Sequence, residues 1–208
     1  SVITANGQNY TFDAVLYATG RKPNTANIGL EHTDIATNER GAIVVNDTCE
    51  SSVPGVYAVG DVNGGPQFTY VSLDDFRIVF GALTGNGQYT LKDRKNIPYT
   101  TFLTPPLSRV GLTEEDAINQ GYTVKTKEML VATMPRAHVN DYLKGAFKIV
   151  VDADNDLILG ATLYSQGAEE LINLIKMAMD NNIPYTYFKN QIFTHPTMAE
   201  NLNDLCNF

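Results

Sequence analysis

Cysteine is scarce in this 208-residue chain, which contains only Cys49 and Cys206. The two form neither a Cys-x-x-Cys pair nor a disulfide framework, which indicates free thiols in a reducing, cytoplasmic environment. Long apolar runs are also missing, since none approaches the roughly 20 residues that a membrane-spanning helix needs. The chain does not open with a charged stretch followed by an apolar one, so no export signal is visible. These absences predict a cytoplasmic protein without a membrane partner.

The chain also lacks clusters of basic residues. The formal net charge is −8, and Lys and Arg are scattered along the chain. Because binding to phosphate groups needs concentrated positive charge, the composition argues against nucleic acid as a partner. Hydrophobic residues make up 43% of the chain, which is enough to bury a sizeable core in one or two domains.

Metal-ligand patterns are missing as well. The three histidines have no ligand spacing, so no zinc site is expected. Asp152, Asp154 and Asp156 alternate as at the opening of a calcium loop, but Leu157 stands where that loop requires glycine. We interpret the three aspartates as a hairpin turn and predict no bound metal.

The pattern of the N-terminal residues is typical of the interior of a domain. Residues 1–12 are typical of two short strands around an Asn6-Gly7 turn, and no initiator methionine precedes them. We therefore expect the chain to be a fragment of a longer polypeptide.

The first half of the chain predicts strands followed by a helix. Apolar runs at 15–20, 43–45 and 55–61 read as strands, and a close approach of the backbone is expected at Gly20, where the first one ends. The helix begins at about Thr69, whose hydroxyl is a candidate cap. It ends at Gly85-Asn86-Gly87, and its apolar residues recur at helical spacing: Leu73, Phe76, Val79, Phe80 and Leu83.

The second half changes to an α+β pattern, and the boundary between the two units is expected near residues 90–97. Helices are predicted at 113–120, with Thr113 as a cap before an acidic first turn, at 168–181, with one apolar face, and from Thr197 to about Leu205. Five runs read as strands: 100–103, 108–111, 122–132, 146–151 and 157–163.

Gly60 and Asp61, at the end of the third predicted strand, allow two interpretations. The Asp61 carboxylate could accept hydrogen bonds from sugar or ribityl hydroxyls, while the N–H groups of Phe68, Thr69 and Tyr70 at the next helix start favour electron-rich oxygens. The alternative is a plain Gly-Asp turn with a packing role only. The residues by themselves leave both interpretations open.

His195 and Glu200 bracket the predicted start of the last helix. Imidazole titrates near neutral pH, and a carboxylate that binds one ring nitrogen fixes which nitrogen carries the proton. Because a residue before proline is held away from helical conformation, we expect the His195 ring to project from a rigid corner. The alternative is an ordinary structural histidine. As a proton-transfer device the pair is half of a site, since no nucleophile, metal or cofactor loop lies nearby in the sequence.

Four segments, taken in this order, resemble the C-terminal part of the FAD-dependent pyridine nucleotide-disulfide oxidoreductases, the family of glutathione reductase, dihydrolipoamide dehydrogenase and mercuric reductase. The segments are Ala18-Thr19-Gly20-Arg21-Lys22-Pro23-Asn24, residues 48–61 ending in Val-Gly-Asp, residues 102–114, and His195-Pro196-Thr197 with Glu200. The last is particular to the dimeric branch with a C-terminal interface domain. Met134-Pro135-Arg136-Ala137 and the flanks of His195 are more similar to a bacterial branch associated with reactive chlorine resistance and hypothiocyanate reduction.

The resemblance implies a role for each site residue. In that family NAD(P)H reduces FAD, the flavin reduces a cysteine pair, and the cysteines reduce a substrate while a histidine of the other subunit acts as acid and base. His195 would be that histidine, and Glu200 would orient it. Asp61 would bind the ribityl chain of FAD, and the amides around Phe68, Thr69 and Tyr70 would face the pyrimidine ring of the flavin. The family often has proline where Tyr70 stands. The cofactor-binding residues implied are Gly20, Gly60, Asp61, Phe68, Thr69 and Tyr70.

The resemblance also implies a fold of α/β to α+β class. Residues 1–20 would be the tail of an NAD(P)-binding domain, 21–95 the C-terminal portion of an FAD-binding domain, and 96–208 a dimerisation domain with an antiparallel sheet flanked by helices. The FAD glycine loop, the redox cysteine pair and the NAD(P) glycine loop lie upstream in this family, so the chain alone is not expected to turn over. Cys206 is single, which argues against mercuric reductase activity.

Two other functions stay open. The chain could be a structural dimerisation module without a bound cofactor, or part of a flavoprotein NADH oxidase or peroxidase that uses a single cysteine. Relatives of the second kind generally lack His-Pro-Thr-x-x-Glu. The resemblance to the disulfide oxidoreductases, in contrast, predicts a homodimer that acts on a small-molecule or disulfide substrate.

Overall fold

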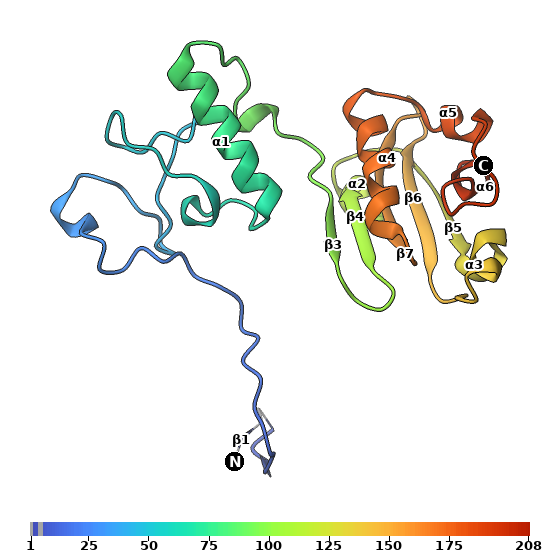
Figure 1. Cartoon of the computed structure of the whole chain (residues 1–208), viewed down its shortest axis with the longest axis horizontal. Coiled ribbons are helices and arrows are strands. Elements are labelled where there is room, and N and C mark those ends of the chain that lie inside the picture. The colour runs from blue at the N-terminus through green and yellow to red at the C-terminus, as the bar shows by residue number, and fades with distance from the viewer. Residues whose placement is uncertain (1, 4–5) are drawn as a thin grey trace. The chain divides into compact units, whose positions relative to one another are not determined.

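The chain divides into two units. The computed structural model describes residues 2–3 and 6–208, and the units comprise residues 1–91 and 92–208 (Figure 1). The second unit has the larger apolar core. In the first, the buried apolar side chains are those of Ala42, Ile43, Cys49, Ala58, Val71 and Ile78.

The first unit opens with a two-stranded hairpin. Strands β1 (Val2–Ile3) and β2 (Asn9–Tyr10) pair antiparallel. Gly7 in the connection has φ of 74°, a conformation that glycine adopts without steric cost. The predicted strand–turn–strand pattern is therefore confirmed for residues 2–3 and 6–10, while positions 1, 4 and 5 of the prediction lie outside the described residues.

The buried strand predicted at 15–20 is not formed. The segment is irregular and exposed, with 89% of Leu16 accessible to solvent. An extended segment becomes a strand only where a neighbouring strand completes its backbone hydrogen bonds, and no strand in the described ranges pairs with this one. The close approach predicted at Gly20 is also absent there, because a Cβ at that residue would meet nothing within 4 Å.

The strands predicted at 43–45 and 55–61 are reduced to single bridges. The Oδ1 of Asn46 accepts the backbone N–H groups of Thr48 and Glu50 at 3.0 Å, so a polar side chain competes with the strand ladder. Two 3-10 helices, η1 (Leu30–His32) and η2 (Gly60–Asn63), belong to this region. What remains of the sheet pattern is single bridges: Thr37 with Ile43, Val45 with Ser51, and Glu50 with Tyr57.

Helix α1 (Thr69–Thr84) is formed as predicted, but Thr69 does not cap it. The extended Phe68 is the N-cap, and its carbonyl accepts the N–H groups of Val71 and Ser72. Gly85 ends the helix in the left-handed conformation, as the Gly-Asn-Gly pattern predicts. One face is buried through Val71, Asp75 and Ile78, while the apolar residues recognised in the sequence are largely exposed within this unit: Leu73, Phe76, Phe80 and Leu83.

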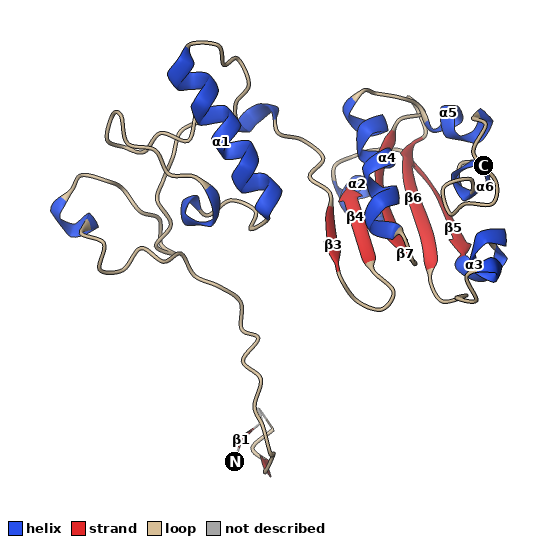
Figure 2. Ribbon diagram, in the orientation of Figure 1, coloured by secondary structure: helices blue, strands red, loops and turns tan. Residues whose placement is uncertain are grey.

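A five-stranded antiparallel sheet is the centre of the second unit (Figure 2). Its order is β3-β4-β7-β6-β5. All five strands occur where the sequence predicts them, and the antiparallel arrangement flanked by helices confirms the expected fold class. The bounds are β3 (Tyr99–Thr101), β4 (Leu107–Gly111), β5 (Val124–Leu130), β6 (Ala146–Asp152) and β7 (Ile158–Tyr164).

Asp152 shapes the turn between β6 and β7. Its carboxylate accepts the Asn155 side-chain amide at 2.7 Å and the Asp154 N–H at 2.9 Å, and these hydrogen bonds lower the pKa of Asp152. Asp156 takes a positive φ of 58° in the same turn. The hairpin interpretation of the three aspartates is confirmed.

Two predicted helices of the second unit are confirmed. Helix α2 (Glu114–Asn119) starts with a capping box, in which Thr113 and Asp116 exchange hydrogen bonds that lower the pKa of Asp116. Helix α4 (Ala168–Asp180) contacts β4 and β7 with its apolar face. The remaining helices are α3 (Pro135–Val139), α5 (Tyr185–Asn190), α6 (Asn201–Leu205), η3 (Leu91–Asp93) and η4 (Val131–Thr133). None of the helices in the described ranges combines the length and the apolar character that crossing a membrane requires.

Helix α6 directly follows Glu200 and packs against the sheet. Leu202 and Leu205 are completely buried in the core, against β5 and β6. The Lys127 ammonium of β5 donates to the carbonyls of Asp204 at 2.7 Å and Asn207 at 2.6 Å. A cation on the last carbonyls of a helix satisfies acceptors that the helix itself leaves open.

Candidate functional site

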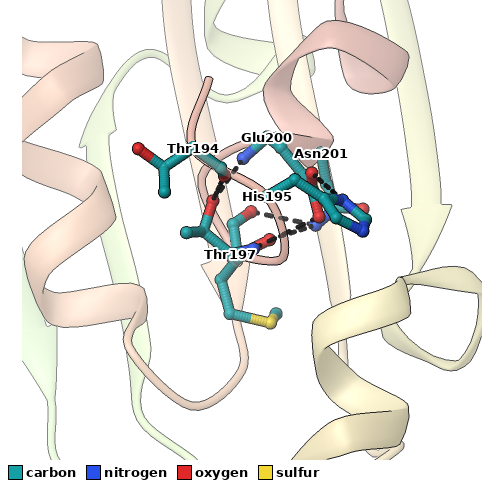
Figure 3. A network of polar contacts seen from close by, with 6 residues as sticks. Thr194, His195, Thr197, Glu200 and Asn201 are labelled. Atoms are coloured by element: carbon teal, nitrogen blue, oxygen red, sulfur yellow. Dashed lines mark hydrogen bonds and ion pairs between the residues drawn. The ribbon is translucent and has the colours of Figure 1, made fainter.

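His195 and Glu200 contact each other directly. The Nδ1 of His195 lies 2.7 Å from Oε2 of Glu200, as Figure 3 shows. The imidazole side chain is 70% exposed, whereas the glutamate side chain is only 17% exposed. A carboxylate on Nδ1 favours the tautomer with the proton on that nitrogen, which leaves Nε2 as the acceptor. The arrangement can therefore present a solvent-facing base whose orientation is fixed from the protein side.

Thr197 fixes the other oxygen of the glutamate. Its backbone N–H donates to Oε1 of Glu200 at 3.2 Å, and its hydroxyl accepts the Glu200 N–H at 3.2 Å. These reciprocal bonds have the geometry of a capping box. The hydroxyl also donates to the Thr194 carbonyl at 2.7 Å. Thr197 thus orients the Glu200 carboxylate independently of the contact with His195.

The last helix begins later than predicted. The sequence predicts a start near Thr197, but α6 begins at Asn201, and the residues before it form tight turns (Figure 3). The reason is local competition: the Asn201 amide, itself buried, donates to the carbonyls of Thr197 at 3.2 Å and Met198 at 3.0 Å. The expected corner at His195 is a bend that includes a cis bond to Pro196.

Asp61 lies at the start of η2 in the first unit. Its carboxylate is 44% exposed and accepts the guanidinium of Arg21 at 3.3 Å. The buried carboxylate of Asp75, on α1, accepts the Gly60 N–H at 2.7 Å and the Asn63 amide at 2.9 Å. Asp75 therefore ties η2 to α1 and sets where Asp61 stands.

The start of α1 belongs to the same region. Gly60 is pressed against it, since a Cβ on Gly60 would lie 2.9 Å from the Ser72 hydroxyl. The N–H of Phe68 donates to the Pro66 carbonyl, while Thr69 and Tyr70 belong to the first turn, whose N–H groups have no acceptor within a helix.

The structure gathers some predicted site residues and not others. His195 and Glu200 meet, and Gly60 and Asp61 stand beside α1, whereas Gly20 lies in the exposed segment of the first unit. Several residues that support the site were not recognised in that role from the sequence: Arg21, Asp75, Thr197 and Asn201. Of these, only Thr197 carries a readable signal, the Thr-x-x-Glu pattern of a capping box.

Neither cysteine is a candidate nucleophile. Cys49 and Cys206 are fully buried, and burial raises the pKa of Cys206 to about 12, against a smaller opposing effect of Lys127. Across the described residues, no group of three or more His, Cys, Asp or Glu side chains is arranged to hold a metal ion.

Two family models match the chain. Residues 97–206, more than half of the chain, match the dimerisation domain of the pyridine nucleotide-disulphide oxidoreductases. Residues 1–75 match the pyridine nucleotide-disulphide oxidoreductase model. The order of the two matches agrees with the order of the segments recognised in the sequence.

Individual relatives agree with the family models. The chain is 49% identical over 193 residues to the probable pyridine nucleotide-disulfide oxidoreductase RclA of Escherichia coli, covering 93% of this chain and 44% of that protein. It is 36% identical to a mercuric reductase of Staphylococcus aureus, covering 96% of this chain and 37% of the reductase. The chain thus spans less than half the length of these relatives.

A solved structure gives the same result. The HOCl-induced flavoprotein disulfide reductase RclA from Escherichia coli superposes with a TM-score of 0.88 at 48% identity, covering 91% of this chain and 43% of that one. This agrees with the resemblance to a bacterial branch associated with reactive chlorine. The chain belongs to the pyridine nucleotide-disulphide oxidoreductase family.

Proposed function

We propose that the chain is part of an FAD-dependent, NAD(P)H-dependent disulfide-type oxidoreductase in which His195 and Glu200 form the acid–base pair. The observation that carries the proposal is the 2.7 Å contact between Nδ1 of His195 and Oε2 of Glu200, and the exposure of the ring supports it. A structural histidine in the core would not present its second nitrogen to solvent. Membership of the family supplies the reaction class.

The chemistry gives His195 a task at two steps. In thiol–disulfide exchange a thiolate attacks one sulfur of a disulfide, the S–S bond breaks, and the departing sulfur takes up a proton. The Nε2 of His195 would accept the proton of the attacking thiol and return one to the departing sulfur. Glu200 would hold the ring and stabilise the imidazolium between these steps. In the proposed homodimer, His195 would serve the site of the partner subunit.

The residues around Asp61 fit a flavin cofactor. Bound FAD would supply the two-electron redox chemistry between a nicotinamide and a disulfide. The half-exposed Asp61 carboxylate can accept hydrogen bonds from ribityl hydroxyls, and the first-turn N–H groups of Thr69 and Tyr70 can donate to electron-rich ring oxygens. Gly60 allows the backbone to lie against Ser72 where a Cβ would not fit. Phe68 and Gly20 would complete the cofactor contacts.

We assign the domains as the resemblance implies. Residues 1–20 would be the tail of an NAD(P)-binding domain, 21–95 the C-terminal portion of an FAD-binding domain, and 96–208 the dimerisation domain. The exposure of segment 15–20 and of one apolar face of α1 supports this assignment, because both are apolar surfaces that partners in a larger protein would cover. The substrate would be a small molecule or a disulfide.

The experiment measures flavin content, reducibility and size on the whole protein. The proposal predicts a yellow homodimer whose flavin is bleached anaerobically by NADH or NADPH and reoxidised by a disulfide substrate. A colourless dimer would support the structural dimerisation module instead. A flavoprotein that consumes oxygen or peroxide but no disulfide would support the oxidase or peroxidase alternative.

A further inference from the structure

Asn203 binds backbone groups far from it in the sequence. Its side-chain amide, on α6, donates to the carbonyl of Phe188 and, at 3.0 Å, to the carbonyl of Gln191. A longer contact of 3.4 Å reaches the Lys189 carbonyl. These carbonyls lie at the C-terminal end of α5, where a helix leaves its last acceptors without internal partners. The amide therefore caps α5 from another helix.

The amide also closes the loop that carries the candidate acid–base pair. Gln191 precedes His195 by four residues, and Asn203 follows Glu200 by three. The bond from Asn203 to Gln191 thus joins the two stems of this loop, which are residues 191–194 before His195 and residues 201–203 after Glu200. Motion of one stem against the other would change the 2.7 Å contact between imidazole and carboxylate.

The stem that holds Asn203 is itself immobilised. Leu202 and Leu205 on either side are completely buried, and the Lys127 ammonium binds the Asp204 carbonyl behind them. The Asn203 side chain is only partly buried and does not belong to the apolar core. Its contribution is therefore its hydrogen bonds, which transmit the fixed position of α6 to the segment before His195.

We propose that Asn203 is a positioning residue, which sets the geometry of the His195–Glu200 pair by clamping the end of α5 to α6. This inference rests on the proposed function for its catalytic consequence, but the geometric effect on the pair is separate and can be measured without turnover. A displacement of about 1 Å at a catalytic group is enough to lower a rate by about 100-fold, so a clamp at this position has a kinetic effect.

The test reads the tautomer of His195 by long-range ¹H–¹⁵N NMR correlation on ¹⁵N-labelled protein, at a pH where the imidazole is neutral. The unmodified protein should show the proton on Nδ1. Asn203→Asp keeps the side-chain shape but removes both N–H donors, and it should shift His195 toward the Nε2–H form. Asn173→Asp is the matched control, because the Asn173 amide makes one 3.0 Å bond to the Glu169 carbonyl within α4. The control should leave the His195 spectrum unchanged.

Asn203→Ser is the second variant. If circular dichroism shows that Asn203→Asp is unfolded, the His195 tautomer is measured in Asn203→Ser instead. In the whole protein, the Asn203 variants should lower kcat about tenfold with little change in KM, because the misplaced pair acts in the chemical step. Retention of the Nδ1–H tautomer in a folded Asn203 variant overturns the proposal. If His195→Ala leaves turnover unchanged, the proposed function fails, while the tautomer still decides whether Asn203 positions the ring.

Discussion

Thr197 and Glu200 bind each other's backbone amides, with 3.2 Å from the Thr197 N–H to Oε1 of Glu200 and 3.2 Å from the Glu200 N–H to the Thr197 hydroxyl. This reciprocal pair orients the carboxylate that meets His195. The glutamate therefore has two functions, one in the local fold and one toward the imidazole.

Removal of the Thr197 hydroxyl should weaken this loop. Thr197→Ala should lower the free energy of unfolding by about 1 kcal/mol, the usual cost of losing a capping side chain. Thr197→Ser retains the hydroxyl and should lose less than half of that. Urea unfolding followed by circular dichroism measures both. Equal losses in the two variants would mean that the threonine methyl, and not the hydrogen bond, stabilises the loop.

Gly145 should tolerate no side chain. Its φ is 124°, and a Cβ there would lie 1.8 Å from the Tyr164 carbonyl oxygen on β7. Gly145→Ala should cost about 3 kcal/mol or more, since backbone of the central sheet has to move. Gly167 has φ of 76° with nothing within 4 Å of its Cβ, so Gly167→Ala should cost only about 1 kcal/mol. Melting temperatures of the two variants, compared side by side, test whether the crowding is real.

Cys206 should be an unreactive thiol. Burial raises its pKa from 9.0 to about 12, so the folded protein retains the thiol proton where the unfolded chain releases it. Stability from this group is accordingly complete below pH 9 and is lost progressively as the pH rises toward 12. At pH 8, Ellman's reagent should modify Cys206 only after urea is added. Rapid modification of Cys206 in a folded Cys49→Ser variant would contradict its burial.

Asp61 should matter for flavin retention in the whole protein. Asp61→Asn removes the charge that accepts hydroxyl hydrogen bonds, and the Kd for FAD should rise about tenfold or more, as expected for a bond to a charged group. Asp34→Asn changes another exposed carboxylate of the first unit and should have no effect. Flavin fluorescence during dialysis gives both constants. Equal retention of flavin in the two variants would favour the plain-turn interpretation of Gly60-Asp61.

The second unit was largely predictable because many of its features are formed by residues that are close together in the sequence. Strands β6 and β7 are joined by a turn whose aspartates are adjacent in the sequence, and α2 carries its own capping box. The His195–Glu200 contact was predictable for the same reason, since five residues separate the partners. In each case the residues that form the feature lie within one short window.

The errors and omissions, in both units, depend on interactions that the sequence pattern does not show. Segment 15–20 has strand-like composition, but composition does not provide the neighbouring strand that its backbone needs. Asn203 was missed because its acceptors are backbone carbonyls 12 to 15 residues away, which no side-chain pattern reveals. The late start of α6 depends on a buried amide that outcompetes the helix, and the Pro196 signal alone does not contain that competition.

The most direct test of the acid–base assignment separates the two half-reactions of the whole protein with His195→Ala. Turnover with a disulfide substrate should fall by about 100-fold or more, the usual scale for a general acid–base residue, while flavin reduction by NAD(P)H stays nearly intact. Glu200→Gln should give a smaller loss, because the imidazole remains. Unchanged turnover in folded, flavin-loaded His195→Ala would contradict the acid–base assignment and remove His195 from the mechanism.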